Sequence, residues 1–182
     1  VLNDSSPIPP PYKPSGNFAL NKDVTASSSI ESMASNMHWY KVKLVDGVRT
    51  SIPASMGWSS VPTTAVTRAE WVRVDLGAPC YVSRVDLYPA KDGAGFPIDF
   101  RIQASDDNLT WSTVAEKRGY EQPADGLVRG FTFPETRARY VRLVATRLRP
   151  GVDGKRMMAL AELEVYHMSD LVRDDDRIGR AE

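Results

Sequence analysis

Apolar and polar residues alternate with a period of two over much of the segment Glu70–Pro89, which reads EWVRVDLGAPCYVSRVDLYP. In its first part the apolar positions are Val72, Val74 and Leu76, and the positions between them are Trp71, Arg73 and Asp75. Successive side chains of a strand point to opposite faces, so this alternation predicts a strand with one buried side. The Gly77-Ala78-Pro79 segment predicts a turn, and a second strand is expected after it.

The same alternation returns in shorter segments further along the chain. These are Asp99–Ser105, Thr110–Val114, Gly130–Phe133, Tyr140–Thr146 and Leu160–His167, with a strand of small residues expected near Val24–Ser29. β-Branched residues supply many of the apolar positions, which favours strands over helices. Turn signals such as Asp92-Gly93 and Pro150-Gly151 separate the segments. No long segment carries an apolar stripe of helical period, so the sequence predicts an all-β sandwich or barrel.

The composition argues against several classes of partner. Lys plus Arg and Asp plus Glu number 23 each in 182 residues, so the formal net charge is zero. The sequence contains no block of basic residues that would predict a nucleic-acid partner. It also contains no long apolar run that would predict membrane insertion and no signal-peptide pattern that would predict export. The single cysteine, Cys80, excludes an internal disulfide and is expected to be a small buried core residue rather than a reactive thiol.

Both ends of the chain differ in composition from the middle. Residues 1–16 contain SSPIPPPYKPSG, which predicts an extended linker because proline cannot pair within a central strand. Residues 169–182 form a charged tail, and its run Asp174–Asp176 is expected to be solvated rather than a cation site. We therefore predict one domain, residues 17–168, taken from a larger protein and monomeric when isolated.

Catalysis by this chain is not expected. Only His38 and His167 are available as bases near neutral pH, and neither lies in a motif typical of nucleophilic or metal-assisted hydrolysis. Carboxylates are numerous, but a glycosidase needs two that converge across a cleft, and the sequence does not indicate such convergence.

The segment Lys43–Ser51 (KLVDGVRTS) offers a candidate cation site together with Glu162. Asp46 and Glu162 could supply two carboxylate oxygens for Ca²⁺, and Gly47 permits a tight turn that aims backbone carbonyls inward. On spacing alone the other interpretation is favoured, because Asp-Gly is a common turn and Glu162 could be an ordinary polar residue on an outer strand face.

Several segments, taken in order, resemble the coagulation-factor type C, or discoidin-like, domain. They are NFALNKDVTASSS, LVDG, GWSS, EWVRVDLGAPCYVSRVDLYP, IDFRIQASDDNLTWSTV, ARYVRLVAT and ALAELEVY. The closer likeness is to the bacterial branch, the family thirty-two type carbohydrate-binding modules attached to glycoside hydrolases. The match spans Asn17 to His167, and a single cysteine excludes the terminal disulfide that animal relatives usually carry.

The resemblance implies an eight-stranded β-sandwich jelly roll with a structural Ca²⁺ near one end. By position, the implied ligands are the Asp46 and Glu162 carboxylates, the backbone oxygens of Lys43, Val48 and Ala161, and oxygen from Ser51 or Thr50. The loop after Asp46 departs from the usual spacing, because IPASM intervenes before Gly57-Trp58-Ser59-Ser60.

The resemblance also implies a sugar site in loops at one end of the sandwich. A pyranose packs its C–H face on an aromatic ring while polar groups bond its hydroxyls. The candidate platforms are Trp39, Tyr40 and Trp58, and the candidate polar partners are His38, Lys91 and Asp92. Trp58 could equally be a core tryptophan, whereas Trp71 and Trp111 lie in strand patterns and are expected to be structural.

The galactose-binding constellation of the relatives is not intact in this sequence. Ala90 stands where many of them carry an arginine, and Ser59 stands where many carry a histidine. Lys91 could replace the arginine only in part, because an ammonium lacks the planar fork of a guanidinium. Galactose specificity is therefore not expected.

These observations predict a non-catalytic carbohydrate-binding module. It would be joined to a secreted, periplasmic or surface-attached bacterial glycoside hydrolase and would hold that enzyme's catalytic domain near its glycan. One alternative is a structural or protein-interaction sandwich without sugar affinity, and another is an enzymatic fragment. An exposed aromatic beside polar groups at a loop end favours the module, whereas burial of the candidate aromatic residues favours a structural domain.

Overall fold

A computed structural model describes residues 16–32 and 36–168. Apart from Gly16, the predicted linker and the tail with Asp174–Asp176 lie outside the described residues. The strands are β1 (Asp23–Ala26), β2 (Trp58–Ser59), β3 (Glu70–Pro89), β4 (Asp99–Ser105), β5 (Ser112–Lys117), β6 (Arg129–Arg147), β7 (Arg149–Pro150), β8 (Arg156–Met157) and β9 (Ala159–Tyr166). Two short 3-10 helices are η3 (Lys41–Val45) and η4 (Lys91–Gly93). Within the described ranges, no helix is long and apolar enough to cross a membrane.

Two strands, β3 and β6, are far longer than the others and run antiparallel along most of their length. Their pairing begins at Glu70 opposite Ala145 and ends at Leu87 opposite Arg129. The register shifts between Asp75 and Cys80, where a turn was predicted. That prediction was wrong: the chain bends there but continues as one strand, with Gly77 at φ 90° and its N–H donated to Asp75. The strands predicted at 130–133 and 140–146 are likewise two parts of β6.

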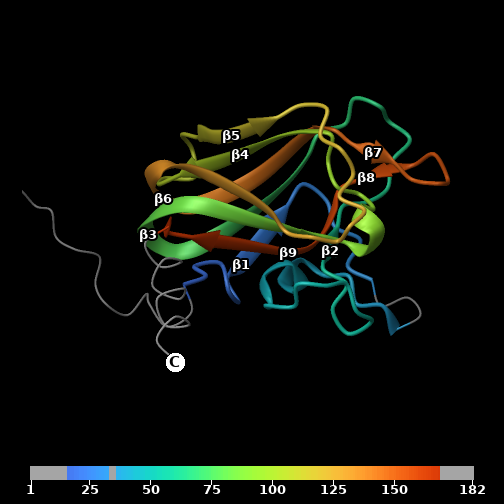
Figure 1. Cartoon of the computed structure of the whole chain (residues 1–182), viewed down its shortest axis with the longest axis horizontal. Coiled ribbons are helices and arrows are strands. Elements are labelled where there is room, and N and C mark those ends of the chain that lie inside the picture. The colour runs from blue at the N-terminus through green and yellow to red at the C-terminus, as the bar shows by residue number, and fades with distance from the viewer. Residues whose placement is uncertain (1–15, 33–35, 169–182) are drawn as a thin grey trace, which may run out of the picture.

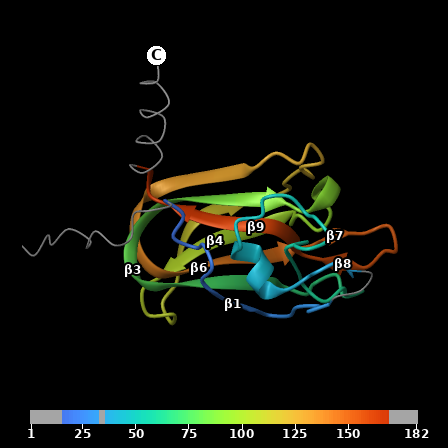
Figure 2. The same cartoon turned by 90° about the horizontal axis from the view of Figure 1, so that it is seen from below.

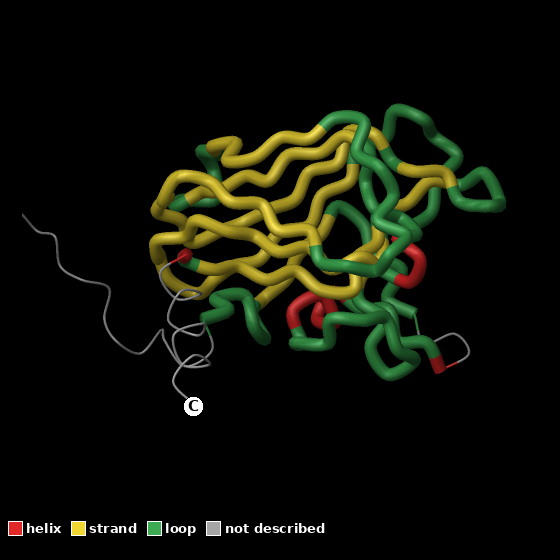
Figure 3. The backbone as a smooth tube through the Cα atoms, viewed as in Figure 1, coloured by secondary structure: helices red, strands yellow, loops and turns green. Residues whose placement is uncertain are grey.

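The bends of β3 and β6 fold one sheet into two layers, which Figure 2 shows edge-on. The first layer holds β1, the first part of β3, the second part of β6, β4 and β5 (Figure 1). The second layer holds the rest of β3 and β6 with β9 and β2. The all-β sandwich predicted from the sequence is therefore confirmed, and loops gather at the end opposite the two bends (Figure 3).

The core lies between the two layers and follows the predicted alternation. Val72, Val74 and Leu76 are buried while the residues between them are only partly covered. The first layer adds side chains such as Phe100 and Leu143, and the second adds Leu163 and others on β9. Cys80 is buried, as predicted, and burial raises the pKa of its thiol to about 11.

The outer face of the second layer is covered by η3 and the chain that follows it up to Gly57, which we call the covering segment. Every residue of β9 is buried, including Glu162 and Glu164 on the outer face, because η3 and the chain after it pack over this strand. Gly57 makes the closest approach: a Cβ built on it would lie 2.0 Å from the Leu160 carbonyl oxygen. The backbone of this segment therefore needs a glycine to sit against β9.

Replacing Gly57 with alanine is expected to destabilise the domain severely. The added Cβ would overlap the β9 backbone, and φ is 96°, a conformation that favours glycine. We expect urea denaturation to show a loss of at least about 4 kcal/mol. Gly119→Ala is the matched control, since φ is 62° and nothing lies within 4 Å of the added Cβ, so only a loss of about 1 kcal/mol is expected. Equal losses in the two variants would contradict the close packing.

Candidate functional site

The predicted platforms Trp39 and Tyr40 lie with His38 in a strip of extended chain. His38 and Tyr40 are in edge-on contact, with ring centroids 6.2 Å apart. Hydrogen bonds to neighbouring segments fix the strip: the Tyr40 N–H donates to the Gly57 carbonyl at 3.1 Å, and the His38 N–H to the Pro53 carbonyl at 2.8 Å. All three side chains are half-buried. We call these three residues the 38–40 cluster.

Trp58, the third predicted platform, is fully buried in the core. It lies on β2 opposite Leu160, and its ring has no exposed face on which a sugar could stack. Its indole Nε1 has no hydrogen-bond partner in the part of the chain that the structure describes. Of the two interpretations left open by the sequence, the core tryptophan is the one that this geometry supports.

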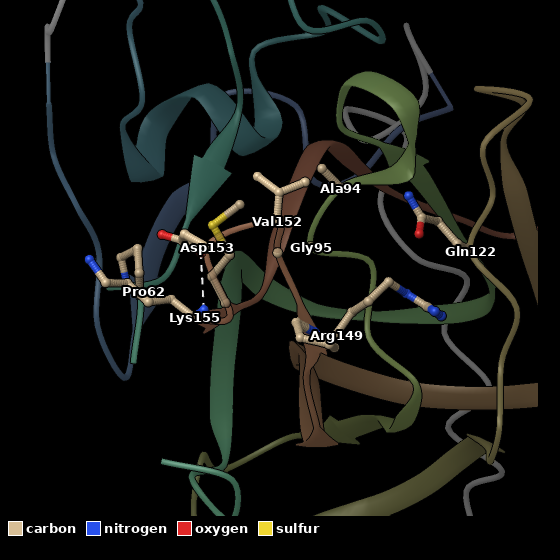
Figure 4. Close-up of a pocket in the computed structure, with 11 residues that line it drawn as sticks. Pro62, Ala94, Gly95, Gln122, Arg149, Val152, Asp153 and Lys155 are labelled. Carbon is tan, nitrogen blue, oxygen red and sulfur yellow. Dashed lines mark hydrogen bonds between the residues drawn. The ribbon is translucent and has the colours of Figure 1, made fainter. Parts of the chain in front are cut away.

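A pocket of about 420 Å³ opens at the loop end of the sandwich (Figure 4). We call it the end pocket. Its wall is built by the β7–β8 hairpin, by the chain after η4, and by single residues of two further loops. The lining residues include Pro62, Ala94, Gln122, Arg149, Val152, Asp153, Lys155 and Met157. In Figure 4, Gln122 and Arg149 border one side and Pro62 and Lys155 border the other.

Some polar groups of the end pocket already form hydrogen bonds with the segments that build its walls. The Arg149 guanidinium donates to the Tyr120 carbonyl at 2.6 Å and to the Phe96 carbonyl at 3.3 Å, which ties the hairpin to two neighbouring loops. Asp153 accepts the Lys155 backbone N–H at 3.0 Å and closes the hairpin turn. The exposed Lys155 ammonium takes part in no ion pair with the described residues, so it can bond a ligand.

Lys91 and Asp92 lie beside the end pocket, on η4, which leads directly into Ala94. Both are exposed, and the Gln122 side-chain amide donates to the Asp92 carbonyl at 2.7 Å. The 38–40 cluster lies on the other side of β9. Leu160 pairs with Trp58 on one flank and with Pro89 on the other, so β9 and β2 separate the cluster from η4. The structure thus divides the predicted sugar contacts into two groups.

The two positions that depart from the galactose pattern offer nothing to a ligand. Ala90 and Ser59 are both buried. The Ser59 hydroxyl donates to the Ser60 carbonyl at 2.9 Å and lies 3.5 Å from the Met157 sulfur.

The predicted cation ligands Asp46 and Glu162 come together where the covering segment meets β9. Glu162 Oε1 accepts the Gly47 N–H at 2.9 Å, whereas Glu162 Oε2 is buried with no hydrogen-bond partner among the described residues. Burial raises the pKa of the Glu162 carboxyl to about 9, and the nearby Asp46 charge adds to the rise. A buried carboxylate oxygen with no partner is what a bound cation would satisfy, so these residues fit Ca²⁺.

The other side chains near Asp46 already have hydrogen-bond or ion-pair partners. The Ser51 hydroxyl donates to the Met56 carbonyl at 2.9 Å, and the hydroxyl on Asp46 is that of Ser55, at 2.7 Å. The Lys43 ammonium lies 3.4 Å from Asp46 Oδ2. The described chain contains no group of three or more His, Cys, Asp or Glu side chains placed to hold a metal ion. A cation here would therefore need backbone oxygens, as predicted for Lys43, Val48 and Ala161.

Sequence reasoning missed most of the lining of the end pocket. Arg149, Lys155 and Met157 belong to a segment read only as a turn, and Gln122 lies in a loop without a motif. The one signal was the pair of turn dipeptides Pro150-Gly151 and Asp153-Gly154, which together outline a short hairpin. Because the pocket draws on four separate segments, no single stretch of sequence marks it.

The folded sheet with a pocket among the loops at one end defines a discoidin-like β-sandwich module. The F5/8 type C domain model matches residues 23–163, and the chain belongs to that family. A search of curated protein sequences found no match.

Solved structures of similar fold include carbohydrate-binding modules of bacterial enzymes. Chitosan-binding module 1 of a chitosanase/glucanase from Paenibacillus sp. IK-5 is 29% identical, with a TM-score of 0.61 over 82% of this chain and 98% of that one. Module 2 of the same enzyme, solved with chitotriose, is 28% identical, with a TM-score of 0.60 over 82% and 99%. The family 32 module of NanJ from Clostridium perfringens, solved with galactose, is 23% identical, with a TM-score of 0.59 over 81% and 94%, and shows likeness of fold alone.

An ion pair fastens the covering segment to β9. The Arg49 Nε donates to Glu164 Oε1 at 2.8 Å and Arg49 Nη2 to Oε2 at 3.1 Å, while the Tyr166 hydroxyl donates to Oε2 at 2.6 Å. The Glu164 side chain is 3% exposed and that of Arg49 is 55% exposed. Glu164 thus depends on Arg49 for its compensating charge.

Arg49→Gln is expected to lower the free energy of unfolding by about 2 kcal/mol, because it leaves the buried Glu164 without a cation. Arg118→Gln is the matched control. Arg118 pairs with Glu116 on the surface, where the loss of an exposed pair changes stability by less than about 0.5 kcal/mol. Urea denaturation of both variants measures the difference, and an equally small loss for Arg49→Gln would contradict the fastening role.

Proposed function

We propose that this domain is a non-catalytic carbohydrate-binding module that binds a glycan in the end pocket. The observation that carries the proposal is the end pocket itself, an open cavity among the loops of a sandwich that aligns with two chitosan-binding modules over nearly their whole length. We further propose that the module is joined to a secreted bacterial glycoside hydrolase and acts as a monomer. It would raise the local concentration of glycan at the attached catalytic domain even when each site binds weakly.

The lining of the end pocket defines what such a glycan contacts. Met157, Pro62 and Val152 offer apolar surface for the C–H face of a sugar ring, while Gln122 and Lys155 offer donors to its hydroxyls. No aromatic side chain is among the lining residues, so the affinity expected for one site is low. The positive charges of Arg149 and Lys155 exceed the negative charge of Asp153, so the pocket is net positive. A net positive pocket disfavours the protonated amino sugars of chitosan and favours neutral or acidic sugars.

The 38–40 cluster is the competing site for the same function. It has the aromatic rings that the end pocket lacks, but its half-buried rings stand across β9 from the polar groups of Lys91 and Asp92. The polar side chains beside it are His38 and the Lys41–Glu31 ion pair, whose ammonium and carboxylate already bond each other at 2.7 Å.

A glycan array of plant, host and microbial sugars, followed by calorimetric titration of any hit, tests the function and the site together. Lys155→Ala and Gln122→Ala are each expected to weaken binding by about tenfold, because each removes a donor to the sugar. Trp39→Ala and the surface control Arg118→Ala are expected to bind like the unmodified protein. All variants are first checked for cooperative thermal unfolding.

The outcomes separate the alternatives. Loss of binding in Trp39→Ala with normal binding in Lys155→Ala would move the site to the 38–40 cluster. If the folded protein binds no glycan on the array, the proposed function is overturned and a structural or protein-interaction sandwich is favoured.

We also propose that Asp46 and Glu162 hold a structural Ca²⁺. The support is the buried Glu162 Oε2, which has no partner in the described residues, beside the Asp46 carboxylate. The cation would supply the charge that lets Glu162 stay ionised under the covering segment and would join that segment to β9. No part in sugar binding is assigned to it.

Adding Ca²⁺ to protein dialysed against chelator is therefore expected to raise the thermal midpoint, since a ligand that binds only the folded state stabilises it by mass action. A 100-fold excess of Ca²⁺ over its dissociation constant corresponds to about 2.7 kcal/mol. Glu162→Gln should abolish the response, whereas Glu116→Gln, an exposed substitution on β5, should keep it. A response that persists in Glu162→Gln would place the cation elsewhere.

A further inference from the structure

The outer face of the first layer carries an unusual combination of arginine and aromatic side chains. We call the residues Trp71, Arg73, Trp111, Tyr140 and Arg142 the Arg-aromatic face. They come from β3, β6 and the residue before β5, and all five are half-buried. None of them lines the end pocket, and this face is not covered by the segment that packs over β9.

Two arginines stand directly opposite each other at the centre of this face. Arg73 on β3 pairs in register with Arg142 on β6. Like charges directly opposite on neighbouring strands are unfavourable. Burial, and after it the positive charge of Arg73, lower the pKa of the Arg142 guanidinium. The fold therefore holds two cations together that repel each other.

Neither arginine of this pair forms an ion pair with a described carboxylate, whereas other arginines of the same layer do. The Asp75 charge acts on Arg73, but the Asp75 carboxylate is bonded to Arg139. Arg139 bonds Asp75 through two hydrogen bonds of 2.9 Å, and Arg101 lies 3.4 Å from Glu116. Arg73 and Arg142 instead donate to the side-chain carbonyl oxygens of Asn108 and Gln103, which carry no charge. These amides orient the two guanidinium groups and leave other donors of each available.

Aromatic rings further hold the two arginines in place. The Arg142 guanidinium carbon lies 3.9 Å from the centre of the Trp111 ring. The Arg73 guanidinium lies between Trp71 and Tyr140, at 5.9 Å and 5.7 Å from their ring centres. Cation–π contacts of this kind fix the position of a guanidinium without neutralising it. The pair is thus pre-organised, and no ion pair with a described carboxylate compensates its positive charge.

We propose that the Arg-aromatic face binds an anionic polysaccharide, with a carboxylate or sulfate group of the polymer held between Arg73 and Arg142. An anion there would relieve the repulsion between the two arginines and accept their remaining donors. From β3 to β5 the face spans three strand spacings, roughly 14 Å, which suits an extended chain rather than a small ion. Trp71 and Trp111 flank the arginines and provide ring edges and faces for neighbouring sugar rings.

A polysaccharide fits this face better than a nucleic acid does. Duplex DNA presents one negative charge per ~1.7 Å of helix axis and is met by broad basic surfaces. Among the described residues of this face, the central pair lacks an ion-pair partner, and the surrounding ion pairs add no net charge. Such a sparse cationic centre matches a polymer in which each sugar carries at most one acidic group. The proposal is independent of the end pocket, so either site can fail its test while the other stands.

Calorimetric titration of the whole chain with polygalacturonate and with dextran sulfate tests the proposal, with neutral dextran as the uncharged comparison. The first two polymers distinguish a carboxylate from a sulfate source. We expect binding to at least one of them and none to dextran, with an affinity that falls as salt is raised. Arg142→Gln and Arg73→Gln should each weaken binding by about tenfold or more.

Arg118→Gln is the matched control, because it removes the same charge from the residue just after the outer strand β5, where Arg118 pairs with Glu116. It should bind like the unmodified protein. The thermal midpoint of each variant should stay within about 2 °C, because both central arginines repel each other and neither pairs with a buried carboxylate. A binding loss without a stability loss separates a ligand contact from a structural role.

Three results would overturn the proposal. The first is no binding to either anionic polymer. The second is an equal loss in Arg118→Gln, which would reduce the effect to overall charge. The third is binding of a single-stranded oligonucleotide as strong as that of the anionic polysaccharide, which would assign the face to nucleic acid instead. Lys155→Ala, which alters the end pocket alone, should leave binding to the anionic polymers unchanged.

Discussion

The whole domain depends on the fact that β3 and β6 belong to both layers of the sandwich. Because the two strands stay paired through their bends, neither layer can form without positioning the other. The bends close one end of the sandwich, where Cys80 and Ala138 pair, and leave the other end to loops. The end pocket lies where the connections are free to vary, while the Arg-aromatic face lies on the part of the sheet where register fixes each side chain.

A second constraint is electrostatic and concerns the outer face of β9. Glu162 and Glu164 are buried there under the covering segment, and each requires compensation. Arg49 provides it for Glu164, while Glu162 keeps one oxygen without a partner among the described residues. The two outer faces of the sandwich are thus opposites: one buries acidic groups beneath the chain, and the other displays arginines to solvent.

Alternation along the chain predicted the strands and their buried sides, because a strand with apolar residues at every second position can bury only the face that carries them. It could not predict that Gly77-Ala78-Pro79 would be a bend within β3, since a glycine at positive φ serves a bulge as well as a turn. Trp58 shows a similar limit: its burial depends on pairing with Leu160, about a hundred residues away. The approach of Glu162 to the Asp46-Gly47 turn was one of two interpretations of the spacing, and the family resemblance favoured it. The end pocket and the Arg73–Arg142 pair arise from register and loop packing, which one sequence does not display.

The β7–β8 hairpin forms a small sheet of its own, apart from the seven-stranded sheet. It is attached through Arg149 and through pairing of Arg156 with Thr63, while Val152 at its tip has its side chain wholly in solvent. Insertions or replacements at that tip would reshape one wall of the pocket without disturbing a core residue. Sequence changes at this hairpin can therefore alter the shape of the end pocket at little risk to folding, and related modules are expected to diverge in hairpin length sooner than in the sequence of their long strands.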